Sequence, residues 1–392
     1  MQDATTHDHF DLPLAGLRVL DFAQFLAGPV AAMRLADLGA EVIKIERPTG
    51  GDLCRSMVVN GQTFDQDSLV FHTFNRGKKS VAANLKDEAD LARVRALIES
   101  ADVMIHNFRP GVMERIGLGY EAVRELNPRL VYGAVSGYGT TGPWVGKPGQ
   151  DLLVQSLSGI AWLNGNAEDG PVPTGFAMLD VATAGNLVQG ILACLLRRSV
   201  SGKGGLVEVD LMSAALDMTS EQLTCFLNDN GRAPKRHAIG NANPYQPAPY
   251  GIYETADGYL AFAMTPLATV AELLDAPEIA AYDQSEAFEK LDEIKAIVAR
   301  YFAGKTTQAW LDILEPAGIW CAPVLDWPEF VATDGFKALD KVQSITAPDG
   351  AQAQTTCCPF RIDGKTVANP KAAPRLGADT EAVFGAGVAA SA

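Results

Sequence analysis

The stretch GPVPTGFAMLDVATAGNLVQGILACLLRR, residues 170–198, carries a carboxylate, Asp180, at the head of an apolar helical run. A loop rich in glycine and proline precedes it, and the small residues Ala182, Ala184 and Gly185 follow it, which leaves room for a bulky ligand. A carboxylate placed in this way can attack an activated carbonyl group. It can also be a helix N-cap, because Asp is a preferred capping residue and complements the helix dipole. This stretch alone favours the capping role.

Basic residues gather in one short part of an acidic chain. The formal net charge of −15 argues against a general binder of nucleic acid or of membrane surfaces. Several basic residues nevertheless follow expected strands, where the phosphates of a ligand would lie. A solvated basic surface explains them equally well. They are Arg47, Arg76, Lys78, Lys79, Lys86, Arg109 and Arg115.

The sequence SGYGTTG imitates a dinucleotide-binding fingerprint. Gly137, Gly139 and Gly142 have the G-x-G-x-x-G spacing and follow an expected strand. The fingerprint should open a helix in the first βαβ unit, but here proline and further glycines extend the loop at the end of the series. The pattern therefore predicts a flexible loop near the ligand and not a nicotinamide or flavin site.

Other catalytic and targeting signals are missing from the sequence. No G-x-S-x-G elbow occurs, and none of the five histidines has a metal-motif partner, so a serine hydrolase and a zinc hydrolase are unsupported. The six cysteines show no C-x-x-C spacing and indicate reduced thiols in a cytoplasmic protein. The polar, acidic start MQDATTHDHFD does not resemble a signal peptide, and the longest apolar runs are too short for a bilayer. We therefore expect a cytoplasmic enzyme without a metal.

Short apolar runs alternate with helical patterns through the first part of the chain. Strands are expected at 17–23, 41–47, 80–85, 102–108 and 130–136, and helices at 28–40, 87–101 and 120–129. This alternation predicts βαβ units, hence an α/β fold with a Rossmann-like large domain and a parallel sheet covered on both faces. Ligands of such sheets bind beyond the carboxyl ends of the strands, so the segments after these strands should converge at one edge.

A change of composition near residue 225 predicts a second domain. Residues 228–251 are rich in proline, glycine and asparagine, and read as a long loop. A hairpin turned at Asp257-Gly258 and several helices follow, up to about residue 318. We expect a large domain over 1–224, a smaller α/β domain over 225–325, and a segment over 326–392 that returns to the large domain.

Together these segments resemble the class III coenzyme A transferase family, also called the CaiB/BaiF or formyl-CoA transferase-like family. The resemblance runs from about residue 12 to residue 383. It rests on PLAGLRVLDFAQFLAGPVAAMRLADLGAEVIKIERPTGGD, FHTFNRGKKSVAANLK, ADVMIHNFRPGVMERIGLGYEAVRELNPRLVYGAVSGYGTTGP, GQDLLVQSLSG, GPVPTGFAMLDVATAG, SGKGGLVEVDL and PRLGADT. It implies a CoA-transferase that uses coenzyme A as acyl-CoA and forms an interlocked homodimer of two ring-like chains.

The resemblance also implies roles for particular residues. Asp180 falls on the catalytic aspartate of the family. The coenzyme would lie against the backbone at Phe25, Leu26 and Ala27. The remaining coenzyme contacts would be Arg47 and Lys86 near the nucleotide end, and Asn107, Phe108 and Arg115 at the adenine and phosphate portions.

The chemistry of CoA exchange explains why a carboxylate belongs at Asp180. Its attack on a donor thioester gives a mixed anhydride and CoA thiolate, and the thiolate then gives an enzyme thioester. An acceptor carboxylate repeats these steps in reverse. Both intermediates hydrolyse, so water must be excluded. Backbone N–H donors for the oxyanions are expected from glycine-containing loops such as 137–142 or 240–251.

Departures from the known subgroups narrow the reaction. Leu26 stands where the formyl and oxalate type carries glutamine, and the loop GNANPYQPAPYG lacks the glycine run of that type, which disfavours formyl or oxalate substrates. The racemase branch uses a GHD motif, whose place is taken by Gly149-Gln150-Asp151; glutamine cannot act as a base at neutral pH, which disfavours racemisation. Asp151 is either a second carboxylate near the site or a structural residue.

We therefore expect CoA transfer from an acyl-CoA to a free carboxylic acid, with Asp180 as nucleophile. A CoA-thioester racemase or isomerase of the same superfamily is the first alternative. A non-catalytic CoA-binding protein is the second. The sequence does not identify either acid.

Overall fold

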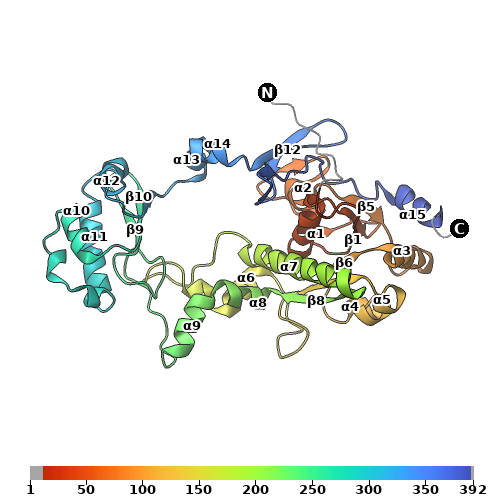
Figure 1. Cartoon of the computed structure of the whole chain (residues 1–392), viewed down its shortest axis with the longest axis horizontal. Coiled ribbons are helices and arrows are strands. Elements are labelled where there is room, and N and C mark those ends of the chain that lie inside the picture. Colours follow the sequence, from red (N-terminus) through yellow and green to blue (C-terminus); the bar gives the residue numbers. More distant parts are fainter. Residues whose placement is uncertain (1–11, 390–392) are drawn as a thin grey trace. The chain divides into compact units, whose positions relative to one another are not determined.

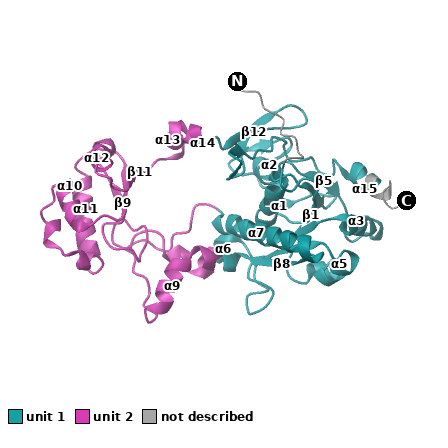
Figure 2. Cartoon of the chain, viewed as in Figure 1, with its two compact units in different colours: residues 1–154, 177–214, 340–392 teal, residues 155–176, 215–339 magenta. Residues whose placement is uncertain are grey.

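The computed structural model describes residues 12–389, so the acidic stretch 1–11 lies outside the described residues. The chain divides into two compact units (Figure 2). Unit 1 takes in the described residues up to 154, then 177–214 and those from 340 onward. Unit 2 takes in 155–176 and 215–339. The large unit is thus assembled from three separate stretches of the chain.

Unit 1 is built on a six-stranded sheet in the order β5-β2-β1-β6-β7-β8 (Figure 1). Every pairing in it is parallel, which confirms the predicted α/β class. The strands are β1 (Arg18–Asp21), β2 (Glu41–Glu46), β5 (Lys79–Ala82), β6 (Val103–His106), β7 (Val131–Ser136) and β8 (Gly205–Asp210).

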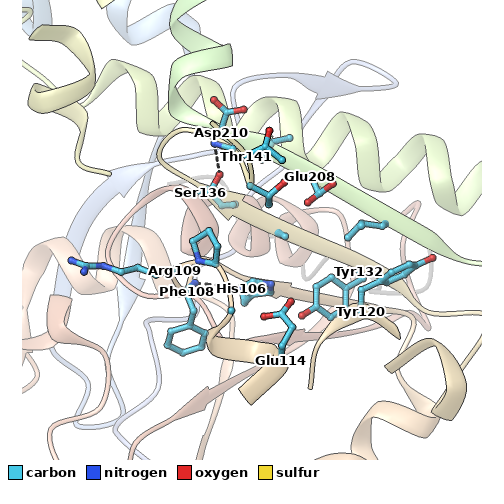
Figure 3. Close-up of a pocket in the computed structure, with 18 residues that line it drawn as sticks. His106, Phe108, Arg109, Glu114, Tyr120, Tyr132, Ser136, Thr141, Glu208 and Asp210 are labelled. Atoms are coloured by element: carbon cyan, nitrogen blue, oxygen red, sulfur yellow. Dashed lines mark hydrogen bonds between the residues drawn. The ribbon is translucent and has the colours of Figure 1, made fainter. Parts of the chain in front are cut away.

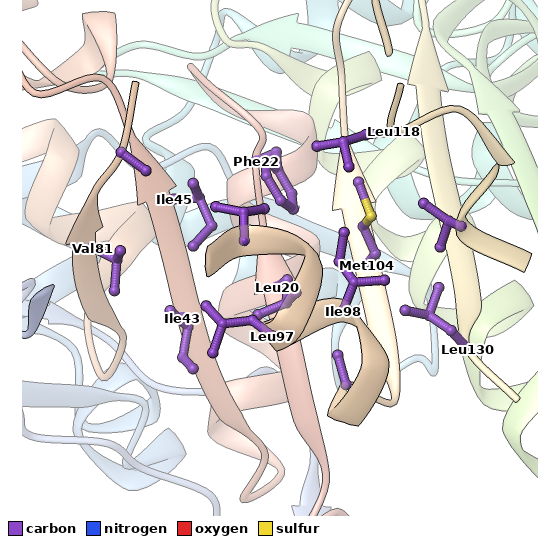
Figure 4. Close-up of a cluster of buried hydrophobic side chains, with 14 of the residues drawn as sticks. Leu20, Phe22, Ile43, Ile45, Val81, Leu97, Ile98, Met104, Leu118 and Leu130 are labelled. Atoms are coloured by element: carbon purple, nitrogen blue, oxygen red, sulfur yellow. The ribbon is translucent and has the colours of Figure 1, made fainter. Parts of the chain in front are cut away.

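Helices cover both faces of this sheet, because its central strands are apolar on both sides. On one face the strand residues Leu20, Ile43 and Met104 pack against Leu97 and Ile98 of a helix (Figure 4). The helices on this face are α3 (Glu88–Ser100), α5 (Tyr120–Leu126) and α15 (Thr380–Ala389), and those on the other face are α1 (Ala27–Asp37) and α7 (Met178–Ser201).

The ends of these helices follow from local sequence. Asp87 caps α3, since its Oδ1 accepts the N–H groups of Ala89 and Asp90, both at 3.0 Å. Gly39 follows α1 with φ +101, a conformation in which a side chain would be strained. The helices expected at 28–40, 87–101 and 120–129 are confirmed with shorter bounds.

Helix α7 spans 24 residues and is long and apolar enough, by length and composition alone, to cross a bilayer. The expectation that the apolar runs are too short to cross a bilayer is therefore wrong for this helix taken as a whole. Its buried residues Leu187 and Ile191 lie on β7, where a Cβ at Gly133 would meet Leu187 Cδ1 at 3.0 Å. This packing is that of a helix that covers a sheet.

The last stretch of unit 1 lies along the edge strand β5. Asp379 Oδ2 accepts the N–H of Ser80, and Thr380 Oγ1 accepts the N–H of Ala82, both at 2.9 Å. The smaller elements of unit 1 are β3 (Thr63–Phe64), β4 (Asp67–Ser68), α2 (Leu69–Asn75), α4 (Val112–Arg115), β12 (Val342–Thr346), β13 (Gln352–Thr356), β14 (Arg361–Ile362) and β15 (Lys365–Thr366).

Unit 2 contains a three-stranded antiparallel sheet and its own core. The hairpin expected at Asp257-Gly258 is confirmed: Glu254 of β9 pairs with Tyr259 of β10. Phe302 and Trp310 lie in the core beside it. The elements are β9 (Gly251–Glu254), β10 (Tyr259–Phe262), β11 (Cys321–Pro323), α9 (Ser220–Asn228), α10 (Leu267–Leu274), α11 (Leu291–Phe302), α12 (Thr307–Leu314), α13 (Trp327–Ala332) and α14 (Asp334–Leu339). Helices α6 (Asp151–Ser158) and α8 (Leu211–Met218) cross the boundaries between the units.

Candidate active site

The strand order of unit 1 reverses between β1 and β6, and ligands of open α/β sheets bind at such a switch point. The loops that follow these two strands are joined there. Asn107 Oδ1 accepts the N–H of Gln24 at 2.8 Å, and Asn107 Nδ2 donates to the carbonyl of Gln24 at 2.6 Å. The structure therefore brings Asn107 beside the loop of Phe25, Leu26 and Ala27.

Asp180 lies in the first turn of α7, but it is not the helix cap. The N-cap residue is Ala177, and it makes no side-chain capping hydrogen bond. The carboxylate that serves the helix start is Asp151, whose Oδ2 accepts the N–H of Leu179 at 2.7 Å and the N–H of Asp180 at 3.1 Å. The capping interpretation of Asp180 is thus wrong: Asp151 takes that task, and the Asp180 carboxyl is left for another one.

A close contact between two glycines brings Asp151 to this place. A Cβ on Gly137, just after β7, would lie 2.4 Å from the Cα of Gly149, so neither position has room for a side chain. The contact closes the loop 138–148 at its base, and α6 then begins at Asp151. Gly137 therefore serves chain packing, and no helix follows the G-x-G-x-x-G pattern until Asp151.

The surroundings of Asp180 raise its pKa to about 7. Burial of the carboxyl is the largest cause, and the negative charge of Asp151 is the second; a hydrogen bond from the backbone of Ala27 acts in the opposite direction. Ala27 is the first residue of α1, and α1 packs against α7. The Asp180 carboxyl thus lies at the start of α1, next to the loop where the sequence predicts coenzyme contacts.

The predicted cationic contacts differ in how accessible they are. Arg47, Lys86 and Arg115 are exposed, and the guanidinium of Arg47 donates to the carbonyl of Gly51 at 3.1 Å. Arg76 and Lys78, which the sequence also grouped with possible phosphate ligands, are buried in ion pairs with Asp37 and Asp21 and are not available. Among these basic residues, Arg47, Lys86 and Arg115 therefore remain accessible to a ligand, and Arg76 and Lys78 do not.

A cavity of about 490 Å³ lies beside Phe108, between the loops after β6 and β7 and the strand β8 (Figure 3). Glu114, Glu208 and Asp210 line it together with a single guanidinium, that of Arg109. His106 also lines it; burial lowers the pKa of His106 to about 4, so its imidazole is neutral. This acidic lining disfavours phosphate groups. Part of the SGYGTTG loop also lines the cavity, at Gly139, Thr140 and Thr141.

The glycine-containing loop 240–251, expected to supply oxyanion donors, belongs to unit 2. The buried ammonium of Lys295 holds both of its ends, since it donates to the carbonyl of Gly240 at 2.9 Å and to that of Tyr250 at 2.6 Å. Within residues 12–389 no cluster of three or more His, Cys, Asp or Glu side chains could hold a metal ion.

Sequence reasoning missed a set of buried charges under the loop after β1. Asp21, Lys44 and Asp52 are at most 1% exposed, and they contact backbone atoms of that loop. One signal was visible: Lys44 interrupts the apolar pattern of the strand EVIKIE. A charge in the middle of a buried parallel strand needs a partner.

Comparison with known proteins shows the family of the chain. The model of CoA-transferase family III matches residues 14–380. The chain is 36% identical to the acetyl-CoA:oxalate CoA-transferase of Acetobacter aceti, over 81% of this chain and 82% of the relative. It is 35% identical to the succinyl-CoA:glutarate CoA-transferase of Mus musculus, over 80% of this chain and 72% of the relative. A crystal structure of a CaiB/BaiF family protein from Brucella suis matches with a TM-score of 0.80 and 30% identity, covering 96% of this chain and 99% of that one. The protein described here belongs to CoA-transferase family III.

Proposed function

We propose that this CoA-transferase moves CoA from an acyl-CoA to a free carboxylic acid through covalent intermediates on Asp180. The observation that carries the proposal is the state of this carboxyl. It is relieved of capping by Asp151, its pKa lies near 7, and it faces the start of α1. A carboxylate with a raised pKa is a stronger nucleophile than an ordinary aspartate and is still ionised in a useful fraction at neutral pH.

In the first half of the reaction, an Asp180 oxygen attacks the thioester carbonyl carbon. The C–S bond breaks, which leaves a mixed anhydride and CoA thiolate. The thiolate then attacks the aspartyl carbonyl of the anhydride. The donor acid departs as its carboxylate, and Asp180 is left as a CoA thioester.

The second half uses the acceptor acid. Its carboxylate attacks the aspartyl thioester, releases CoA thiolate and forms a second mixed anhydride. The thiolate attacks the acyl carbon of the acceptor, which gives the new acyl-CoA and restores the Asp180 carboxylate. No proton or redox partner is consumed, and one thioester replaces another.

The backbone at Phe25, Leu26 and Ala27 would hold the thioester end of the coenzyme in this proposal. Helix α1 begins at Ala27, and its N-cap residue Leu26 makes no side-chain capping bond. Its first N–H groups can therefore stabilise negative charge that develops near Asp180. The exposed cations Arg47, Lys86 and Arg115 would contact phosphates, and Phe108 would contact the adenine.

Asn107 would act through the loop, because both polar atoms of its amide are already bonded to Gln24.

Small dicarboxylic acids are the acceptors to test first. The two curated relatives carry oxalate and glutarate in their names, each with an acetyl-CoA or succinyl-CoA donor. Leu26 differs from the glutamine of the formyl and oxalate type, but the likeness to an acetyl-CoA:oxalate transferase keeps oxalate in the panel. Mass spectrometry of new thioesters, after incubation with acetyl-CoA or succinyl-CoA and a set of acids, would identify the pair.

The decisive variant is Asp180→Ala, measured by exchange of CoA between acids. We expect loss of exchange, with CoA binding retained within about threefold, and loss of the Asp180 hydroxamate that hydroxylamine forms from the wild-type enzyme. Asp90→Ala is a matched control, because Asp90 occupies the same third position of the first turn in α3. Retained exchange in Asp180→Ala would contradict the proposal. Solvent deuterium entering the α-carbon of an acyl-CoA without an acceptor acid would indicate a racemase instead.

A homodimer in the cytoplasm completes the proposal. Support for the dimer comes from helix α7, whose apolar side chains Val181, Leu196 and Val200 are 49%, 74% and 90% exposed in the single chain. Such a row of exposed apolar groups indicates a surface that a second protein chain covers.

A further inference from the structure

The backbone between Ala23 and Phe25 is held by four side chains, one from the end of the preceding strand β1 and three from other segments. Asp21 Oδ1 accepts the N–H of Ala23 at 2.9 Å, and Lys44 Nζ donates to the carbonyl of Ala23 at 2.6 Å. The side-chain amide of Asn107 forms hydrogen bonds with the backbone N–H and the backbone carbonyl of Gln24. Asp52 Oδ1 accepts the N–H of Phe25 at 3.1 Å. No helix or strand ladder supplies these bonds, so the path of the loop depends on the side chains.

Phe25 needs this support. Its φ is +64, a left-handed conformation that a bulky residue rarely adopts, and the residue is 45% exposed. Neither local preference nor burial of the ring accounts for the conformation. Strained backbone of this kind persists where the surroundings over-determine it, and it is typical of ligand sites.

A buried ion pair lies directly below the strained residue. Lys44 Nζ is 2.8 Å from Asp52 Oδ2, and both side chains are at most 1% exposed. Lys44 projects from the middle of β2, and Asp52 precedes the short helix that begins at Leu53. Each partner holds one backbone atom of the loop, the carbonyl of Ala23 and the N–H of Phe25, so the pair fixes the two sides of Gln24 together.

The same pair connects the loop to the segment of Arg47. The N–H of Asp52 donates to Glu46 Oε2 at 2.9 Å, and Arg47 donates to Gly51 O. Residues 46–52 thus form a closed turn whose last residue reaches Phe25. The expected contacts for the nucleotide end and the thioester end of the coenzyme therefore share one buried anchor.

We propose that the Lys44–Asp52 ion pair is a positioning device of the transferase, which holds the Gln24–Ala27 turn against the carboxyl of Asp180. The inference rests on the proposed function, because it needs Asp180 to react at the start of α1. Lys44 and Asp52 touch neither the thioester nor the coenzyme. They act through the backbone of Ala23 and Phe25.

A purely structural role makes a different prediction. Buried ion pairs are often no better for stability than apolar side chains of the same volume, so removal of both charges need not unfold the protein. A structural pair would change the free energy of unfolding and leave the kinetics of the folded enzyme alone. A positioning pair would change kcat, because misplacement of reacting groups by about 1 Å costs on the order of 100-fold in rate.

The chain offers a matched control in the Asp37–Arg76 pair. Both side chains are at most 1% exposed, and Arg76 NH2 donates to Asp37 Oδ2 at 2.9 Å. Asp37 is the last residue of α1, at the end opposite to Ala27. Asp37→Asn therefore removes a buried carboxylate from the far end of α1 and leaves the contacts of the Ala23–Phe25 backbone unchanged.

The experiment compares Asp52→Asn, the double variant Lys44→Met with Asp52→Asn, and Asp37→Asn, each at a temperature where the variant is folded by circular dichroism. The double variant leaves no unpaired charge, so it tests the idea even if the single variant fails to fold. We expect kcat for acyl exchange to fall about 100-fold in both Asp52 variants. CoA affinity should fall far less than kcat, because the bond of Arg47 to Gly51 and that of the Asp52 backbone N–H to Glu46 remain in the variants. Asp37→Asn should keep the wild-type kcat.

Wild-type kcat in the double variant would overturn the positioning role. A kcat loss in Asp37→Asn equal to that in the double variant would overturn it too, because the effect would then be general. Asp180→Ala is measured alongside. If it retains exchange, the proposed function fails; if it loses exchange while the double variant keeps it, only the positioning role fails.

Discussion

Asp151 and Asp180 are two carboxylates at one helix start with different tasks. Asp151 accepts backbone N–H groups of Leu179 and Asp180, which is the work of a cap supplied from a distant segment. Its negative charge then helps to raise the pKa of Asp180, second to burial. The residue that orders the helix thus also tunes the residue that we propose to react.

The pH dependence of exchange follows from this pair. Attack requires ionised Asp180, so kcat/KM should fall as the pH drops through about 7. Asp151→Asn keeps an oxygen for the two N–H groups but removes the charge, so the acid limb should move to lower pH. Kinetics between pH 5 and 9 check this. An unmoved or raised limb in the variant would show that Asp151 does not tune the nucleophile.

The raised pKa of Asp180 should also make the free energy of unfolding depend on pH. The sign is opposite to that of a salt-bridged aspartate, whose pKa is lowered. The folded pKa of Asp180 lies above the unfolded value of 3.8, so the folded protein holds the extra proton between about pH 4 and 7. The destabilisation by the ionised group is therefore fully present above pH 7, and it is absent below pH 4. Asp180→Asn should raise the free energy of unfolding by roughly 1–3 kcal/mol at pH 8 and by nothing at pH 4. Urea unfolding of Asp180→Asn and Asp90→Asn at both pH values measures it; equal effects in the two variants would refute the idea.

The sequence marked some of these residues better than others. Asp180 was visible because a family motif surrounds it, and Asp151 because it is the last residue of the altered GHD motif. The Lys44–Asp52 pair was not visible as a unit, since its members lie on a strand and after a turn and meet only when the sheet forms. Arg76 and Lys78 misled for the converse reason: charge and position suggested a ligand, and folding buries both in ion pairs.

At the scale of elements, the regular strands and helices of the sheet were predictable from alternating apolar runs. The strands expected at 17–23, 41–47, 80–85, 102–108 and 130–136 match β1, β2, β5, β6 and β7. The loops between them were not predictable, because tertiary contacts set their paths. The contact of Gly137 with Gly149 is such a case: it joins residues on both sides of a loop, and the glycine spacing alone suggested a cofactor motif.

We expect the contact between Gly137 and Gly149 to set the position of α6, and a substitution at Gly149 tests this. Gly149→Ala would place a Cβ 2.5 Å from the Cα of Gly137, so the base of the loop must open and the start of α6 must shift. Asp151 would then leave the N–H groups of α7, with loss of both exchange and stability, the latter by roughly 1–3 kcal/mol. Gly146→Ala lies in the same loop, and nothing lies within 4 Å of its added Cβ. Measured kcat and unfolding midpoints should separate the two variants; equal behaviour would argue against the role of the contact.

At the scale of the whole molecule, helix α7 carries both the proposed nucleophile and exposed apolar side chains. Asp180 stands in its first turn, and the same helix presents Leu196 and Val200 to solvent in its last turns. Leu196 is 74% and Val200 90% exposed, which is unfavourable for apolar side chains of a single chain in water. A second copy of the chain that covers this face would bury them.

The assembly prediction is that the wild-type protein has about twice the mass of one chain by light scattering after size exclusion. Leu196→Glu with Val200→Glu should give a monomer or an aggregate, because burying two carboxylates in an apolar contact is costly. Ala92→Glu adds a charge to the exposed side of α3 and should leave the dimer intact. Exchange should be lost with the dimer if both chains are needed to close the site against water, which the anhydride and thioester intermediates require. A wild-type monomer that catalyses exchange would contradict the assembly prediction. The residues of one chain would then be enough to keep water away from Asp180.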